Sequence, residues 1–188
     1  PGLSREEAAR IARYLFLLDV ALERGAAAVA VGHNADDQVE SVVMHWLRGS
    51  GLAGLRGMLP RANLAEMRLG ETEPGTTRPV WLIRPLLECT REEIEDYCRR
   101  HGLQARYDAS NLDTTLYRNR LRHELIPYLE RFNPNICQVL RRTARVLAQD
   151  YDYLHSQVLV VWESLVEEPA EGVCRIERAG WQALHPSL

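Results

Sequence analysis

An apolar run that ends in a glycine and opens into an acidic helix start constrains the fold more than any other feature of this chain. Residues 26–31 have the length and apolar character of a buried strand, and Gly32 follows directly. A helical pattern begins at about Ala35, with Asp36 and Asp37 in its first turn. Open α/β sheets place their sites in this way, at the carboxyl edge of a strand. The pattern therefore predicts an α/β fold with a site at this strand-to-helix turn.

The carboxylates of this helix are arranged unfavourably for an isolated helix. Asp36 and Glu40 are four residues apart, so they share a face and repel by roughly 0.2–0.5 kcal/mol. The helix dipole offsets this repulsion for Asp36 only, because its effect fades after the first turn. A cation or a cationic substrate would relieve the rest. We therefore expect a positively charged or metal-bound reactant near these two side chains.

The apolar residues of the same helix predict one buried face. They recur at helical spacing, and we expect them to face the sheet: Val39, Val42, Val43, Trp46 and Leu47. The glycine-punctuated segment 48–58 and the polar segment 61–78 predict loop and irregular structure. Residues 80–83 are a second strand candidate, and the capping-box pattern from Thr90 to Glu93 predicts another helix.

Bulk properties exclude several classes of protein. The 188 residues include no apolar stretch long enough to span a bilayer and no N-terminal signal pattern. The four cysteines form no C-x-x-C pair, which argues against a zinc site, an iron–sulfur cluster or a disulfide framework and favours a cytoplasmic protein. A net charge of −3 gives no general indication of nucleic-acid binding.

A local excess of positive charge stands out against this acidic background. Residues 118–145 contain seven arginines against Glu124 and Glu130. Arg118 and Arg122 are four residues apart and repel unless an anion lies between them. One interpretation is a strip that contacts phosphate. The other is that Arg118 or Arg122 pins the helix to Asp108 or Asp113.

The second half of the chain has a different character. Segment 117–130 predicts a helix that is interrupted near Pro127, and a long helix should follow Asn133-Pro134. Helices of this length often bridge two domains. We therefore expect residues 1–128 to form one domain, and residues 129–188 to form a linker helix with the start of a helical second domain.

Five motifs in order carry a family resemblance. They are Gly32-His33-x-x-Asp36-Asp37-Gln38-x-Glu40, Leu47-Arg48-Gly49-Ser50-Gly51-x-x-Gly54-Leu55, Arg84-Pro85-Leu86-Leu87, Asp108-x-Ser110-Asn111 and Arg118-Asn119-Arg120-x-Arg122-His123-x-Leu125-x-Pro127. This series closely resembles the tRNA(Ile)-lysidine synthetase family of the PP-loop (N-type) ATP pyrophosphatases. The resemblance covers about residues 4–150 and implies a Rossmann-like parallel sheet followed by a mainly helical region.

The resemblance also implies a reaction. Members of the family use ATP and magnesium to adenylate the wobble cytidine of tRNA(Ile), and L-lysine then displaces AMP. It implies catalytic roles for His33, Asp36, Asp37 and Glu40, with Asp36 or Asp37 as a magnesium ligand. It implies substrate or RNA contacts for a second set of residues: Arg48, Ser50, Arg118, Asn119 and Arg122. Whether His33 acts as a general base or as an RNA contact stays open, and so does a homodimer.

One departure limits what the chain is expected to do alone. The family's phosphate loop, S-G-G-x-D-S, matches nothing in residues 1–188. We therefore expect an internal fragment that neither binds ATP well nor turns over by itself. Two other functions remain open on the sequence: a tRNA thiolase of the same superfamily, and a non-catalytic RNA-binding or helical interaction module.

Overall fold

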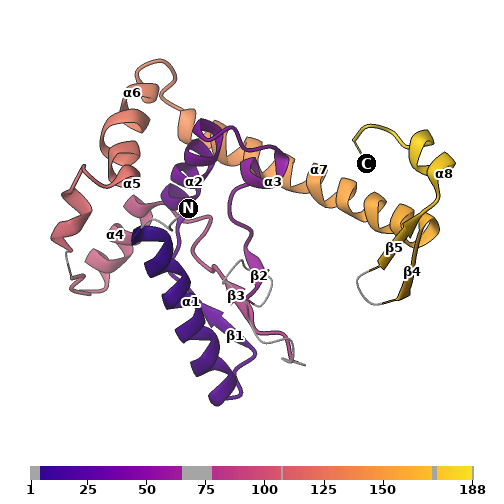
Figure 1. The fold of residues 1–188 in the computed structure, drawn as a ribbon. Coiled ribbons are helices and arrows are strands. Elements are labelled where there is room, and N and C mark those ends of the chain that lie inside the picture. Colours follow the sequence, from indigo (N-terminus) through magenta and orange to yellow (C-terminus); the bar gives the residue numbers. More distant parts are fainter. Residues whose placement is uncertain (1–4, 65–77, 107, 171–172, 188) are drawn as a thin grey trace.

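A three-stranded sheet forms the base of the site (Figure 1). The computed structural model describes residues 5–64, 78–106, 108–170 and 173–187. Strand β3 (Trp81–Ile83) lies between β1 (Ala28–Ala30) and β2 (Arg61–Asn63). β1 and β3 are parallel, so their carboxyl ends meet at one edge. Both predicted strands and the α/β class are confirmed.

The sheet is mixed rather than wholly parallel, because β2 pairs with β3 in the antiparallel sense. β2 lies in the polar segment that was predicted to be irregular, so this prediction was wrong for residues 61–63. Three residues of low apolar content give no strand periodicity. Their strand conformation comes from hydrogen bonds to the central strand, where Leu82 is fully buried.

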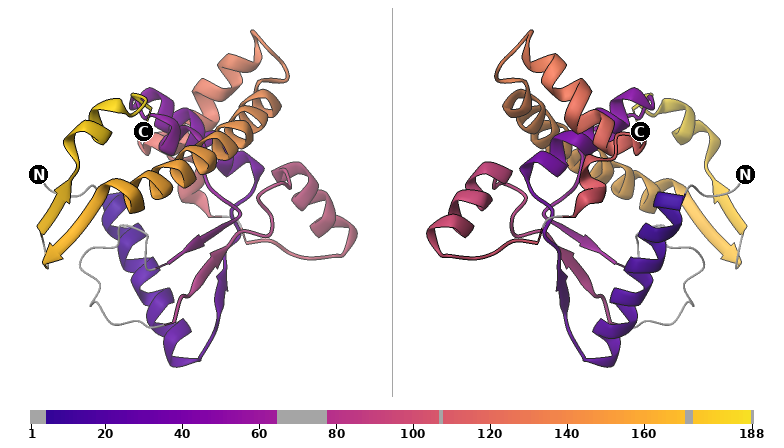
Figure 2. Two further views of the ribbon diagram at one scale, coloured as in Figure 1. Left: turned by 90° about the vertical axis from the view of Figure 1, so that its right-hand side faces the viewer. Right: turned by 90° about the vertical axis from the view of Figure 1, so that its left-hand side faces the viewer.

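Helix α1 (Arg5–Glu23) covers one face of this sheet (Figure 2). Its residues Tyr14, Leu18 and Ala21 are buried in one cluster with Leu82 of β3, Val80 just before β3 and Leu64 just after β2. These buried residues of α1 therefore build one of the core clusters found among the described residues.

Helix α2 (Ala35–Leu47) begins beyond the carboxyl end of β1 and enters a second, helical layer. Val39 and Val43 pack against Leu121 rather than against the sheet, and Trp46 is 61% exposed. The prediction that the whole stripe faces the sheet was therefore wrong. Periodicity identifies which positions share a face, but it does not say which element covers that face.

The partner of α2 is a continuous helical run with one irregular turn. It consists of α5 (Tyr117–Arg120), the π-helical turn η2 (Leu121–Leu125) and α6 (Ile126–Glu130). Pro127 has no N–H to donate, and its ring crowds the carbonyl of the residue four positions earlier. The wider π turn accommodates both effects. The predicted interruption near Pro127 is thus a local change of helical winding.

Helix α7 (Ile136–Leu165) runs from this helical layer to a small hairpin (Figure 1). At its start it packs on α2, on α6 and on the short helix α3 (Leu52–Leu55), which lies inside the segment predicted to be a loop. Its far end leads into the hairpin and last helix: β4 (Val166–Ala170), β5 (Val173–Ile176) and α8 (Arg178–Ala183).

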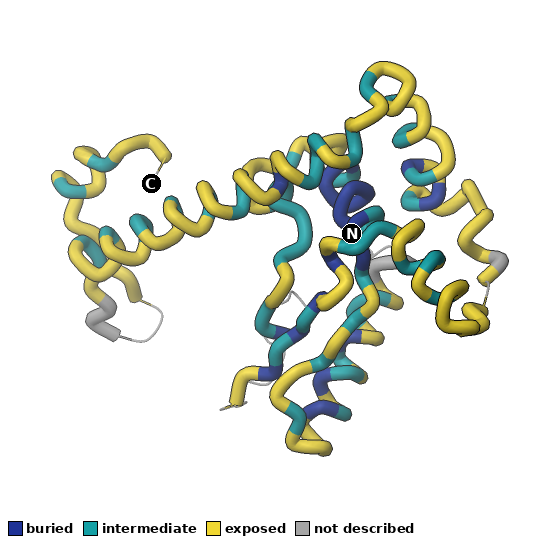
Figure 3. Tube along the Cα trace, turned by 180° about the vertical axis from the view of Figure 1, so that it is seen from behind, coloured by how far each residue is buried: buried dark blue, intermediate teal, exposed yellow. Residues whose placement is uncertain are grey.

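Burial concentrates around the sheet and α2, and Ala144 is the buried residue of α7 in the described part of the chain (Figure 3). The helix beyond this point is covered by few other elements. Among the described residues, no helix combines the length and the apolar character needed to cross a bilayer.

Candidate active site

A reciprocal cap fixes the start of α2 and orients Asp37. The Asn34 N–H donates to Oδ2 of Asp37 at 3.0 Å, and the Asp37 N–H donates to Oδ1 of Asn34 at 3.0 Å. This capping box satisfies two backbone donors that a helix start leaves unpaired. One oxygen of Asp37 is therefore committed to the helix cap.

Asp36 connects two helix starts. Its Oδ2 accepts a hydrogen bond of 2.7 Å from the backbone N–H of Arg91, the first residue of α4 (Arg91–Arg100). A second hydrogen bond joins the same two segments, from the Ala35 N–H to the Cys89 carbonyl oxygen at 2.8 Å. Two helix N-termini thus converge on this carboxylate, which their dipoles stabilise.

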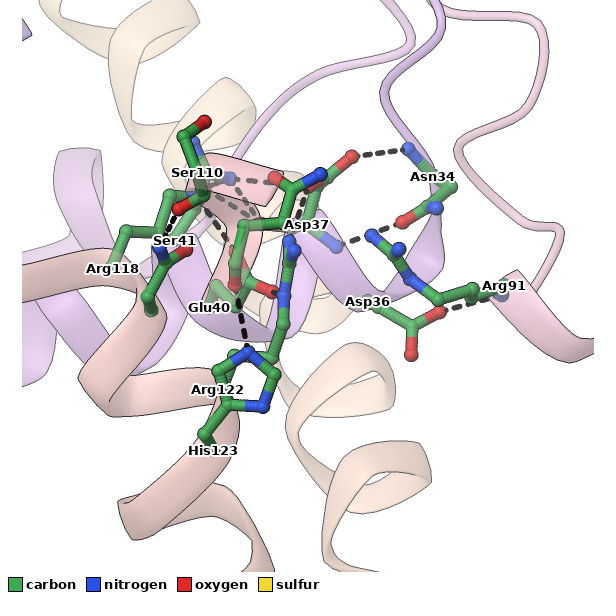
Figure 4. Close-up of polar contacts among 12 residues, drawn as sticks. Asn34, Asp36, Asp37, Glu40, Ser41, Arg91, Ser110, Arg118, Arg122 and His123 are labelled. Atoms are coloured by element: carbon green, nitrogen blue, oxygen red, sulfur yellow. Dashed lines mark hydrogen bonds and ion pairs between the residues drawn. The ribbon is translucent and has the colours of Figure 1, made fainter. Parts of the chain in front are cut away.

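Glu40 is the most deeply placed carboxylate of the site and is held by two arginines (Figure 4). It is 1% exposed, and Nε of Arg118 and Nε of Arg122 each donate to one of its oxygens at 2.6 Å. Both guanidinium groups also lie within 3.6 Å of Oδ1 of Asp37. The result is a network of two carboxylates and two cations that joins α2 to α5 and η2.

This network bears on the second interpretation of Arg118 and Arg122, and contact with phosphate stays a prediction. Both arginines pin their helix, as the second interpretation expected, but the anticipated partners Asp108 and Asp113 were wrong. Burial acts to lower the pKa of Arg122, but the hydrogen bond and the charge of Glu40, with Asp37, raise it above its ordinary value. The repulsion predicted along α2 is therefore relieved by cations of the chain itself.

Asn119 lies between the two arginines in the sequence, but it bonds to the backbone of a neighbouring turn rather than to a carboxylate. It is buried, and its Nδ2 donates to the carbonyl oxygens of Ser110 and Asp113 at 2.8 and 2.9 Å. His123 contacts the carbonyl oxygen of Asn111 at 2.9 Å. These bonds hold the turn η1 (Ala109–Leu112) beside the network.

Arg48 and Ser50 lie away from this cluster. Arg48 caps the carboxyl end of α2, and the positive φ of Gly49 (71°) ends the helix. Twelve residues of helix put Arg48 about 18 Å from Asp36 along the axis. The guanidinium of Arg48 lies over the ring of Tyr117, with Cζ 5.8 Å from the ring centroid. The structure therefore brings Arg118 and Arg122 together with the predicted catalytic residues, but it does not bring Arg48 or Ser50 to them. Those catalytic candidates are His33, Asp36, Asp37 and Glu40.

Arg84 is a site residue to which the sequence analysis gave no role. It follows β3 as His33 follows β1, and its Nε donates to Nδ1 of His33 at 3.3 Å. Burial, and then the charge of Arg84, lower the pKa of His33. The motif that contains Arg84 was noticed, but only the parallel pairing of the two strands places this arginine next to His33.

A pocket of about 590 Å³ opens beside Asp36. Its walls come from the starts of α2 and α4, from η2 and α6, and from α7. Charges of both signs line it: Asp36, Glu40, Glu95, Asp108, Glu130, Arg91, Arg106, Arg122 and Arg141. Such a lining suits a ligand that itself carries both charges, such as an amino acid.

The family follows from a comparison with known proteins. Residues 2–129 match the model of the PP-loop domain. The chain belongs to the PP-loop domain family. This PP-loop chain is 41% identical over 186 residues to the tRNA(Ile)-lysidine synthase of Dehalococcoides mccartyi. The alignment covers 99% of the chain and 38% of that synthase. It is 32% identical over 188 residues to the synthase of Clostridioides difficile, covering 100% of the chain and 37% of that protein.

A solved structure shares the fold. The U34-tRNA thiolase of Methanococcus maripaludis superposes with a TM-score of 0.51 at 20% identity, over 78% of this PP-loop chain and 45% of the thiolase. At this identity the likeness concerns the fold alone. The chain spans little more than a third of the length of the curated synthases named above.

Proposed function

We propose that this PP-loop chain belongs to a tRNA(Ile)-lysidine synthase, an ATP-dependent ligase that forms a carbon–nitrogen bond between L-lysine and the wobble cytidine of tRNA(Ile). One observation carries the proposal. The likeness to the Dehalococcoides mccartyi synthase extends over 186 residues, whereas the general PP-loop match ends at residue 129. The match to this synthase therefore includes the segment that forms the long helix α7 and the hairpin beyond it. The proposal places the protein in the cytoplasm, with its tRNA.

In the proposed reaction, a carbonyl oxygen of the cytosine attacks the α-phosphate of ATP, and pyrophosphate leaves. The adenylated oxygen is then a good leaving group. The unprotonated lysine amine attacks the ring carbon, a carbon–nitrogen bond forms, and AMP departs with that oxygen. The amine loses a proton in this step, so a carboxylate close to it assists the reaction.

The pocket beside α2 supplies groups for the lysine. Asp36 lies at its wall and accepts one hydrogen bond through Oδ2, which leaves its second oxygen for an ammonium or amine. Arg91 and Arg141 line the same pocket and suit the carboxylate of an amino acid, because a guanidinium binds carboxylates in a two-point fashion. Glu40 acts indirectly in this proposal, since both of its oxygens are already bonded to arginines.

Asp36 is also the better of the two proposed magnesium ligands. Magnesium takes one or two carboxylates together with substrate phosphates and water. One oxygen of Asp37 accepts from Asn34 and the other lies 3.5 Å from Arg122, so Asp37 has no oxygen away from a donor. Of these two carboxylates, Asp36 is therefore the one with an oxygen that can bind magnesium, as the alternative to the lysine amine at the same oxygen. A bound magnesium ion would stabilise negative charge on the phosphates of ATP.

The RNA contacts are divided between two ends of α2 in this proposal. The side chain of Arg118 is 37% exposed despite its bond to Glu40, so part of its guanidinium can reach a phosphate. Arg122 is 20% exposed and has a mainly structural part. Asn119 positions the turn η1, while Arg48 and Ser50 offer a separate contact at the far end of the helix.

A chimeric enzyme tests the proposed function. The 186 matching residues of the Dehalococcoides mccartyi synthase are replaced by this chain, and lysidine formation on an unmodified tRNA(Ile) transcript is measured with ATP and labelled lysine. The expected result is lysine incorporation that depends on the wobble cytidine. A tRNA(Ile) transcript with uridine at that position is the matched control. Asp36→Asn in the chimera should lower lysine incorporation by at least about 100-fold, an effect of the size seen for groups that act in a proton transfer.

Two results would contradict parts of the proposal, the first its ligase activity and the second only the RNA role of Arg118. One is a folded chimera that binds ATP and tRNA(Ile) but transfers no lysine. The other concerns the chain alone, whose binding to the two transcripts is compared by filter retention over a salt series. Arg118→Ala should reduce the salt slope by about one counterion, as expected for a lost phosphate contact. An unchanged slope removes the RNA role of Arg118.

A further inference from the structure

Arg84 is a buried cation without a carboxylate partner among the described residues. It is 7% exposed. Its Nη1 donates to the Leu59 carbonyl oxygen at 2.6 Å, and its Nε donates to Nδ1 of His33 at 3.3 Å. Burying a charge is costly unless it is paired. An arginine kept in this position is therefore expected to serve a function beyond packing.

The bond to His33 fixes the position of the ring proton. The Nε of arginine always carries its hydrogen, so Nδ1 of His33 must accept. A neutral imidazole has one donor and one acceptor nitrogen, and the bond made by one nitrogen decides the state of the other. The proton of His33 is therefore on Nε2.

The surroundings keep this ring neutral. Four charged groups act on it: Arg84 after β3, Arg118 from α5, Arg13 from α1 and Asp37 from α2. Burial has the largest effect and lowers the pKa of His33, the three cations add to this, and Asp37 alone opposes them. The lowered pKa and the bond from Arg84 to Nδ1 both favour the neutral form of His33.

We propose that Arg84 is a positioning residue that holds His33 as a neutral hydrogen-bond donor, whose Nε2–H is offered to a substrate oxygen at the carboxyl edge of β1. The oxygen is one that gains negative charge during the reaction, a carbonyl or a phosphoryl oxygen. A neutral imidazole that donates to such an oxygen stabilises the charge as it develops.

This role excludes the general-base role that the sequence left open. A base needs a free lone pair, and the lone pair of the ring is held by a cation. The inference rests on the proposed function only for the identity of the oxygen, because the tautomer is a property of the chain without substrate.

Imidazole nitrogen NMR of the ¹⁵N-histidine-labelled chain tests the proposal. His33→Gln identifies the signals of His33. We expect a pyridine-type shift at Nδ1 and a pyrrole-type shift at Nε2 at neutral pH. His45 is a matched internal control with the opposite pattern, because its Nδ1 lies 2.7 Å from the Gly54 carbonyl oxygen, which can only accept. His123 is a second control, with Nε2 bound to a carbonyl oxygen.

Substitution of Arg84 tests whether this residue sets the tautomer and the pKa of His33. In Arg84→Gln, His33 should populate both tautomers and its pKa should rise, while His45 and His123 keep their patterns. In Arg84→Lys, the positive charge remains, so the pKa of His33 should stay low while the tautomer preference weakens.

Three outcomes overturn the proposal: a protonated Nδ1 on His33 in the unsubstituted chain, a doubly protonated ring at pH 7, or an unchanged tautomer in folded Arg84→Gln. If Arg84→Gln does not fold, the spectrum of the unsubstituted chain still decides. All of these measurements are made without tRNA or ATP, so failure of the ligase assignment would be seen separately.

Discussion

Arg122 and Glu40 lie 82 residues apart in the sequence, yet Nε of Arg122 donates to Oε1 of Glu40 at 2.6 Å. Arg118 binds the other oxygen of the same carboxylate. A buried carboxylate between two arginines joins α2, which follows the strand-to-helix turn after β1, to α5 and η2. The site is thus assembled by charge pairing between distant segments.

Removal of the charge of Glu40 should destabilise the fold strongly. Glu40→Gln leaves two arginines facing each other without their counter-charge, and breaking a buried pair in this way costs about 3 kcal/mol. Glu124→Gln is the control, because Glu124 pairs with Arg120 at 3.7 Å where both side chains are 58% exposed. Such a surface pair contributes about 0–1 kcal/mol. Urea unfolding measures both, and equal losses would contradict the network's structural role.

Gly57→Ala should lower the free energy of unfolding more than Gly25→Ala. Both glycines have positive φ, 66° and 62°. An added Cβ at Gly57 would lie 2.7 Å from Nε2 of Gln38, which clamps Met58, whereas nothing lies within 4 Å at Gly25. Gly25→Ala should cost about 1–2 kcal/mol from the backbone alone. Gly57→Ala should exceed this by at least about 1 kcal/mol, because a packed side chain must move. Similar losses of stability in thermal unfolding would show that the Gln38 side chain moves aside at little energetic cost.

The stability should depend on pH through His33. Its pKa is lowered from 6.5 in the folded chain, so the unfolded chain binds more protons as the pH falls below 6.5. Stability is therefore lost as the pH falls from 6.5 toward the lower folded pKa, and is fully present above 6.5.

His33→Gln should remove this part of the pH dependence. Urea midpoints of the two proteins between about pH 5.5 and 8 give the comparison. The advantage of the unsubstituted chain over the variant should shrink on acidification. A constant difference across the series would mean that His33 titrates alike in both states.

The 188-residue chain by itself should bind Mg-ATP weakly, because it contains no S-G-G-x-D-S loop or other glycine-rich phosphate cradle. Isothermal titration of the chain with Mg-ATP should show no micromolar affinity. The chimera described above, which keeps the remaining sequence of the Dehalococcoides mccartyi synthase, is the positive control. Micromolar binding by the chain alone would contradict this expectation.

Local features of the site were predictable because their causes lie within a few residues. The turn after β1 and the capping box of α4 at Thr90 and Glu93 appear where the sequence placed them. The start of α2 with its acidic first turn was also predicted. In each case, one turn of backbone and one side chain determine the structure.

The partners of the charged residues were not predictable in the same way. The sequence offered several carboxylates for Arg118 and Arg122, both within the acidic motif and after residue 105, and the two that were named, Asp108 and Asp113, were wrong. Arg84 received no role, since nothing near it in the sequence indicates contact with His33, 51 residues away.

The sequence by itself determined the α/β pattern, the acidic start of α2, the long helix α7 and the resemblance to the PP-loop family. These follow from hydrophobic spacing, capping and motif order, which act over short stretches of chain. Only the tertiary structure decided that β2 joins the sheet, that α2 packs on helices, and that Glu40 is neutralised from α5 and η2. The physical reason is that an ion pair or a strand pairing depends on which distant segments approach each other, and that approach is fixed by the packing of the whole chain.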